Sequence, residues 1–231
     1  PAIIHGGPFA NIAHGCNSVQ ATKIGMQLAE YCVTEAGFGA DLGAEKFFDI
    51  KCRYAGLRPD CVVMVATVRA LKMHGGAPAD RLDEPNPAAV AAGLENLQKH
   101  CENMELFGVP VVVAVNVFTE DTEAELTLLE REVEQMGLRA VRCSVWRDGG
   151  AGATELGAEV MRTCASTDPE RFRLLYEDHL GLKEKIELIA TRIYGAEGVD
   201  FYSRAERVLD RFTAHGYGHL PVCMAKTQAS L

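Results

Sequence analysis

Two apolar stretches decide the fold of this 231-residue chain: CVVMVATV at residues 61–68 and VPVVVAV at residues 109–115. Both are rich in β-branched side chains, and neither alternates apolar with polar residues. Continuous hydrophobicity of this kind is typical of strands that are buried on both faces, as in a parallel sheet. Shorter apolar runs predict further strands at residues 31–34, 140–145 and 220–225.

Amphipathic stretches of helical length separate these runs and follow them. They lie at residues 43–53, 88–106, 122–136, 151–165, 183–194 and 203–214. The repeated succession of strand and helix favours an α/β fold with an open, mostly parallel, doubly wound sheet and a second α/β subdomain. Segments 77–87 and 166–169 are candidate junctions between the subdomains.

The chain is acidic, with 32 Asp and Glu against 23 Lys and Arg and a formal net charge of -9. This balance excludes a nucleic-acid-binding protein that relies on a broad basic surface. A ligand with phosphate or carboxylate groups therefore needs a local positive site. No apolar stretch approaches the ~20 residues that span a bilayer, and no secretory signal opens the chain. We therefore expect no membrane partner and a cytoplasmic protein.

Metal ligation has no supporting pattern. The eight cysteines are far apart and form no C-x-x-C pair, so small buried side chains in a reducing compartment are favoured over a metal or disulfide framework. A zinc site from His5, His14 and His74 is conceivable without a recognisable spacing, and His215 with His219 sits among glycines. We expect no metal held by these side chains.

Ligands of open parallel sheets bind beyond the carboxyl ends of the strands, so the residues after each predicted strand are candidates for a site. Gly37 and Gly39 follow the first run, on a predicted strand-to-helix turn that could bring backbone N–H groups close to an anion. Because of this spacing, an NAD-dependent oxidoreductase remains an alternative function. Such a site also needs an acidic residue after the next strand, where this chain has residues 67–69, Thr-Val-Arg.

Three cationic side chains, Arg69, Lys72 and His74, follow the second predicted strand and precede Gly75 and Gly76. They could form the local positive site, with arginine as a two-pronged donor and lysine as a point charge. A solvated turn with one or two salt bridges is the alternative.

Two aromatic rings follow the next two strands. Phe118 comes shortly after Asn116, and Trp146, the single tryptophan, precedes a glycine-rich loop. Rings that face each other there could hold a flat heterocycle by stacking, whereas the alternative is that both rings cap the core. The acidic run EDTEAE at 120–125 opens the helix at 122–136, and it is interpreted as a solvated helix start.

Four long motifs give the sequence a recognisable resemblance. They are GPFANIAHG at 7–15, TEAGFGAD at 34–41, VATVRALKMHGG at 65–76 and LPVCMAKTQ at 220–228. With them the whole chain resembles the formate–tetrahydrofolate ligase family. The resemblance implies that formate attacks the γ-phosphate of ATP, with Mg²⁺, to give formyl phosphate. The N10 amine of tetrahydrofolate then takes the formyl group, which gives 10-formyltetrahydrofolate.

The resemblance also assigns roles to residues of this chain. Phe118 and Trp146, with Asn116, are implied to bind the folate. The other implied residues are Arg69, Lys72, His74, Asn11 and His14 for catalysis, and Gly37, Gly39, Gly75 and Gly76 for the nucleotide or its phosphates. Relatives are often homotetramers, so the resemblance implies a homotetramer. It leaves open whether a monovalent cation activates the enzyme.

The resemblance is to the middle-to-late portion of a family enzyme more than twice this length. The chain starts with Pro1 in an apolar segment, and it has no G-x-x-x-x-G-K-[ST] run and no G-x-S-x-G run. We expect both ends to be internal points of a longer protein whose P-loop lies upstream. Residues 1–107 are then the end of a nucleotide-binding domain, and residues 108–231 are part of a folate-binding subdomain. A non-catalytic scaffold or oligomerisation fragment remains the alternative from another class.

Overall fold

The computed structural model describes residues 16–225 and contains two compact units. One unit is continuous in sequence, from residue 59 to residue 172. The other combines residues before 59 with residues after 172. The expected boundary between residues 107 and 108 lies inside the continuous unit, because the strands on its two sides are hydrogen-bonded neighbours. The assignment of a ligand to each side of that boundary stays a prediction.

A three-stranded parallel sheet organises the unit 59–172. Its strands are β1 (Val62–Ala66), β2 (Val111–Asn116) and β3 (Arg139–Cys143), in that order across the sheet. Val113 of β2 lies between Met64 of β1 and Ala140 of β3. The first five residues of β2 are buried, which confirms that the run of valines is a central strand with both faces covered.

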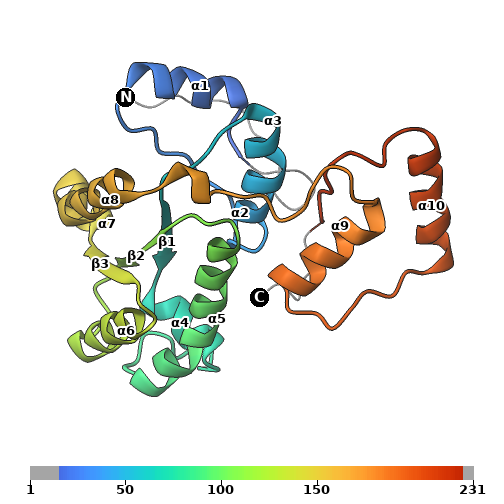
Figure 1. Cartoon of the computed structure of the whole chain (residues 1–231). Helices are drawn as coiled ribbons and strands as arrows, with labels where there is room; N and C mark the ends of the chain where they lie inside the picture. Colours follow the sequence, from blue (N-terminus) through green and yellow to red (C-terminus); the bar gives the residue numbers. More distant parts are fainter. Residues whose placement is uncertain (1–15, 226–231) are drawn as a thin grey trace. The chain divides into compact units, whose positions relative to one another are not determined.

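Helices cover both faces of this sheet (Figure 1). The elements outside the strands are α4 (Val68–His74), α5 (Pro87–Leu106), α6 (Glu123–Gln135), α7 (Val145–Asp148), the 3₁₀ helices η2 (Gly149–Ala153) and η3 (Pro169–Arg171), and α8 (Thr154–Ser166). Arg142 of β3 pairs with Glu130 of α6, whereas Arg139 pairs with Glu159 of α8. Side chains an odd number of residues apart on a strand point to opposite faces, so α6 and α8 lie on opposite faces of β3.

The second unit is helical in its described parts. Its helices are α1 (Val19–Leu28), α2 (Gly43–Lys46), the π-helix η1 (Phe47–Cys52), α3 (Arg53–Ala55), α9 (Leu182–Leu188), the π-helix η4 (Ile189–Ile193) and α10 (Ser203–Ala214). Buried polar contacts join its two sequence segments. Asp49 is fully buried and accepts a hydrogen bond from the Leu175 N–H at 2.9 Å, and Arg53 donates to the Tyr176 carbonyl at 2.6 Å.

Two predicted strands are wrong. Residues 31–34 form no strand, since Val33 is 88% exposed and the neighbouring segment makes only the isolated bridge between Cys16 and Ala36. Residues 220–225 are also irregular, and the Val222 N–H donates to the Tyr176 hydroxyl at 3.1 Å instead of to a strand. Short apolar runs predict strands only where a partner strand is available. The described part of this unit is therefore not an α/β subdomain.

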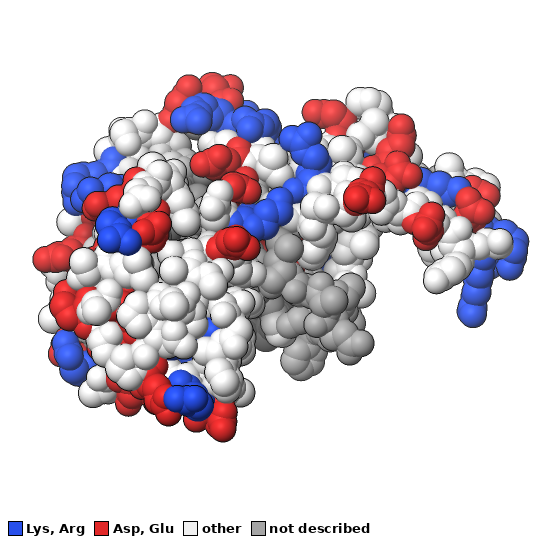
Figure 2. All heavy atoms as spheres, turned by 90° about the horizontal axis from the view of Figure 1, so that it is seen from below, with Lys and Arg blue, Asp and Glu red and all other residues white. Residues whose placement is uncertain are grey.

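The surface carries charges of both signs close together. On the face shown in Figure 2, acidic and basic side chains alternate over the described residues without a broad field of one sign. Many of these charges are paired, as in the exposed ion pair between Arg81 and Glu84 at 2.6 Å. No helix among residues 16–225 is long and apolar enough to cross a membrane.

The contact between α4 and α5 depends on two glycines. A Cβ added to Gly93 would lie 2.0 Å from the Leu71 carbonyl oxygen, and one added to Gly75 would lie 1.9 Å from that of Ala89. Both neighbours are backbone atoms, so they cannot move away without shifting a helix. These glycines set the distance between the two helices.

We expect Gly93→Ala to destabilise the protein by about 2 kcal/mol, because the added methyl group overpacks this contact. Gly157→Ala in α8 is the matched control, since a Cβ there meets nothing within 4 Å. Alanine is the better helix former, so the control gains up to about 1 kcal/mol. Urea unfolding of both variants measures the difference, and equal stabilities would contradict the close contact.

Candidate functional site at the carboxyl edge of the sheet

The aromatic rings of Phe118 and Trp146 lie face to face beyond the carboxyl ends of β2 and β3. Their centroids are 5.7 Å apart and their planes differ by 14°. Phe118 is 38% exposed and Trp146 is 51% exposed, so they do not cap the core. The rings are thus stacked on each other and open to solvent, at the edge where ligands of parallel sheets bind.

The loop after β2 places both rings. The Val117 N–H donates to the Cys143 carbonyl at 2.9 Å, which continues the pairing of β2 and β3 by one residue. The Trp146 Nε1–H donates to the Val117 carbonyl at 2.6 Å, and the Phe118 N–H donates to Asp121 Oδ2 at 2.8 Å. The indole and the phenyl ring are therefore tied to the same short piece of backbone.

The helix that follows this loop starts with two reciprocal hydrogen bonds. The Thr122 side chain accepts from the Glu125 N–H, and the Glu125 carboxylate accepts from the Thr122 N–H at 3.1 Å. This capping box fixes the first turn of α6. The T-x-x-E spacing is visible in the sequence, and it could have indicated that Glu125 is not a solvated charge.

Glu125 is buried and bound to Lys72 of α4. Neither side chain is more than 1% exposed, and Lys72 Nζ lies 2.8 Å from Glu125 Oε1. The same ammonium donates to the carbonyls of Leu82 and Glu84 at 3.2 and 2.9 Å, and the Asn86 N–H donates to Glu125 Oε1 at 2.7 Å. Segment 77–87 is thus held inside the unit and is not a junction between subdomains.

Several bonds set the protonation state of Glu125. Burial raises the pKa of this carboxyl, but donation from the Asn86 N–H, from Lys72 and from Thr122 outweighs burial and lowers the pKa to about 2. The interpretation of residues 120–125 as a solvated helix start is therefore wrong for Glu125.

A pocket of about 710 Å³ lies between the end of β3 and the starts of η2 and α8. Its lining includes Ser144, Asp148 and Gly152 from the segment around α7, together with Glu155 at the start of α8. The Ser144 hydroxyl donates to Asp148 Oδ2 at 2.6 Å, which braces the short helix that carries Trp146. Sequence patterns did not single out Ser144 and Asp148, because a four-residue helix leaves no periodic signal.

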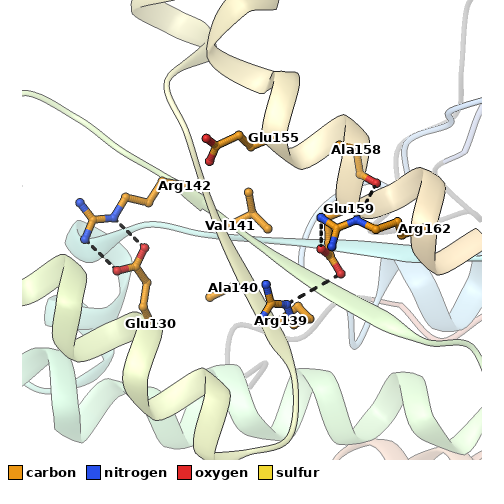
Figure 3. A pocket seen from close by; sticks show the side chains of 9 residues that line it. All are labelled: Glu130, Arg139, Ala140, Val141, Arg142, Glu155, Ala158, Glu159 and Arg162. Atoms are coloured by element: carbon orange, nitrogen blue, oxygen red, sulfur yellow. Dashed lines mark hydrogen bonds and ion pairs between the residues drawn. The ribbon is translucent and has the colours of Figure 1, made fainter.

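A neighbouring pocket of about 320 Å³ runs along the edge strand β3 (Figure 3). Arg142 from β3 reaches Glu130 of α6, and Arg139 and Arg162 converge on Glu159 of α8. These opposite charges are already paired, so the pocket does not provide the local positive site.

Comparisons with known proteins place the chain in a family. The profile of the family described as Formate–tetrahydrofolate ligase matches residues 1–231. The chain belongs to the formate–tetrahydrofolate ligase family. A relative named Formate–tetrahydrofolate ligase, from Symbiobacterium thermophilum, is 55% identical over 231 residues. That match covers 100% of this chain and 41% of the relative, so the chain spans less than half of the relative's length.

The three residues that the ligase resemblance marks as catalytic, Arg69, Lys72 and His74, differ in their surroundings. They lie on a helix, α4, and not on a turn. Arg69 pairs with Asp83, Lys72 is enclosed by Glu125, and His74 is exposed in the last turn. The segment is a helix and not the expected cationic loop, and two of its three basic side chains are already paired with carboxylates. Their individual roles stay predictions.

The glycines expected to bind phosphate lie in two different environments. The Gly75 N–H donates to the Leu71 carbonyl and the Gly76 N–H to the Met73 carbonyl, so both close the end of α4. A helix C-terminus repels anions, and this geometry does not favour phosphate binding there. Gly37 and Gly39 flank Phe38, which has a φ of 64° and is 58% exposed.

Of the three remaining predicted residues, only Asn116 belongs to the described part of the chain. Asn116 ends β2 at the same edge as the ring pair and is half-buried. Asn11 and His14 lie outside the described residues. No group of three or more His, Cys, Asp or Glu side chains among residues 16–225 is placed to hold a metal ion.

We expect Glu125→Gln to cost about 3 kcal/mol of stability at pH 7, because it leaves the buried Lys72 ammonium without its counter-charge. The pKa of Glu125 is lowered from 4.5 to about 2 in the folded protein. Its contribution is therefore complete above pH 4.5 and is lost as the pH falls toward 2.

Urea unfolding of wild type and Glu125→Gln between pH 2 and pH 7 measures this contribution. The stability difference between the two proteins should shrink over the acidic range. Glu132→Gln, which removes a surface charge from α6, is the control with little effect at any pH. A constant difference from pH 7 to pH 2 would contradict the buried ion pair.

Proposed function

We propose that this chain carries the tetrahydrofolate-binding part of a formate–tetrahydrofolate ligase. The complete enzyme would use ATP to join formate to tetrahydrofolate through formyl phosphate, and it would release 10-formyltetrahydrofolate. The observation that carries the proposal is the stacked, exposed pair of Phe118 and Trp146 in a member of this family.

The ring pair suits a flat heterocycle. A pteridine stacked between two rings needs about 7 Å between them, which is two van der Waals layers of roughly 3.5 Å. The ring centroids are 5.7 Å apart, so the two rings must move apart before a pteridine can stack between them. Phe118 follows a strand and Trp146 lies on a four-residue helix, so a small loop movement suffices.

The other substrates are proposed from the family. Phosphoryl transfer from ATP to formate needs positioned cations near the phosphates rather than covalent help from the protein. We propose Arg69, which follows the carboxyl end of β1, as this cation, with Lys72 in support. Further candidates for contact with the phosphates or formate are His14, His74 and the neutral Asn11. The proposal assigns Mg²⁺ to the nucleotide rather than to a site on residues 16–225.

Further properties of the ligase are proposed on the same basis. The family suggests a cytoplasmic homotetramer of one-carbon metabolism, with a monovalent cation as a possible activator. The structure does not favour an NAD-dependent oxidoreductase, because a dinucleotide fingerprint must follow a strand and Gly37 follows none. A non-catalytic scaffold or oligomerisation fragment remains the competing function from another class.

Tetrahydrofolate should quench the emission of Trp146, the single tryptophan, when it is titrated into the protein. Phe118→Leu should weaken this binding about tenfold, because it removes one of the two stacking faces. Phe212→Leu is the matched control, since Phe212 is similarly exposed at 43% but belongs to α10. Emission and calorimetry that stay silent with both folate and nucleotide would favour the scaffold.

The 231 residues assayed alone should form little or no 10-formyltetrahydrofolate, because the sequence contains no P-loop to hold the β- and γ-phosphates of ATP. A coupled assay with formate, Mg-ATP and tetrahydrofolate measures this. The buffer without protein sets the background. Robust product formation would refute the proposal that nucleotide binding needs further sequence.

A further inference from the structure

The peptide group between Val117 and Phe118 is bound on both of its sides. Its carbonyl accepts the Trp146 Nε1–H at 2.6 Å, and its N–H donates to Asp121 Oδ2 at 2.8 Å. Because a peptide group is planar and rigid, these two bonds together fix its orientation. The orientation of this peptide sets the direction in which the Phe118 side chain leaves the backbone.

We propose that Asp121 is a positioning residue for the Phe118–Trp146 pair, and that the buried ion pair of Lys72 and Glu125 supports it from within the unit. This inference rests on the proposed function for the part that concerns tetrahydrofolate. The Asp121 carboxylate binds the backbone N–H of Phe118, so it acts on the ring through that backbone.

Asp121 is held in place at both ends of its turn. Its own N–H donates to the Phe118 carbonyl at 3.2 Å, which closes a turn over residues 118–121. The next residue, Thr122, starts the capping box with Glu125, and Glu125 is bound to Lys72 at 2.8 Å. Hydrogen bonds and the covalent link between Asp121 and Thr122 thus connect the buried ion pair to the backbone of Phe118.

Burial, one hydrogen bond and three nearby charges together set the pKa of Asp121. Burial raises the pKa of this carboxyl, and so do the negative charges of Glu125 and Glu120. The hydrogen bond from the Phe118 N–H and the positive charge of Lys72 lower the pKa. The net pKa is above the ordinary value. Lys72 thus forms an ion pair with Glu125, and its charge also favours the ionised form of Asp121.

This arrangement lowers the cost of binding. The rings must move apart to admit a ligand, and a phenyl ring on a free loop would also have to be ordered at that moment. With the Val117–Phe118 peptide already oriented, the ligand meets a ring that is parallel to the indole to within 14°. Loss of the Asp121 carboxylate should leave the indole tied to Val117 but release Phe118.

The test compares Asp121→Ala with Glu120→Ala, which removes the same charge from the adjacent, exposed residue. Without ligand, Asp121→Ala should change the near-ultraviolet circular dichroism and the emission of Trp146, whereas Glu120→Ala should not. In titrations, tetrahydrofolate should bind Asp121→Ala about tenfold more weakly than wild type, which is the scale of losing a bond to a charged acceptor. Asp121→Asn keeps an acceptor oxygen and should lose only about threefold.

In the complete ligase, Asp121→Ala should raise the KM for tetrahydrofolate about tenfold and leave the KM for ATP unchanged. A loss of general stability would lower the fraction of active enzyme, and hence the apparent kcat, and would leave both KM values unchanged. If Asp121→Ala fails to fold, as judged by far-ultraviolet circular dichroism, Asp121→Asn against Glu120→Gln takes over the comparison.

The outcomes separate the two proposals. Identical ligand-free spectra and equal affinities for Asp121→Ala and Glu120→Ala, with wild type binding tetrahydrofolate, would overturn the positioning role and leave the proposed function intact. A spectral change in Asp121→Ala together with no binding by wild type would support the positioning of the rings and overturn the folate site.

Discussion

The ion pair between Lys72, in the last turn of α4, and Glu125, in the first turn of α6, holds several elements of the unit 59–172 together. The ammonium and the carboxylate are almost completely buried, so their mutual charge and their hydrogen bonds must replace the water that each has lost. Lys72 also binds the carbonyls of Leu82 and Glu84, and Glu125 also binds the N–H of Asn86. One pair of side chains thereby joins α4, the following loop, the start of α5 and the start of α6.

The buried ion pair also helps to fix the loop that carries Phe118 at the carboxyl edge of the sheet. The first turn of α6 is fixed by the same Glu125, and this turn directly follows the loop that carries Phe118. The ring on that loop lies parallel to Trp146, whose helix is braced by Ser144 and Asp148. A stacked pair with both rings exposed has little packing of its own to hold it. Its geometry must come from the backbone bonds below it.

The other unit uses buried charge in a similar way, without a strand in its described part. Asp49 lies on the π-helix η1, fully buried, and accepts hydrogen bonds from the Leu175 N–H and from Arg53. Burial raises the pKa of Asp49 to about 6, although the bonds from Leu175 and Arg53 act in the opposite direction. The carboxylate joins segments that are more than a hundred residues apart in sequence.

The sequence by itself determined the parallel strands at 61–68 and 109–115, the positions of the long helices, and the placement of Phe118 and Trp146 just after neighbouring strands. Continuous hydrophobicity and strand ends are local properties, so a single sequence contains them. Only the tertiary structure decided that residues 31–34 are not a strand, that Lys72 is buried against Glu125, and that the two rings are stacked at 5.7 Å. These outcomes depend on which distant segments meet, because a strand needs a partner and a buried charge needs a counter-charge, and neither is written in the residues next to it.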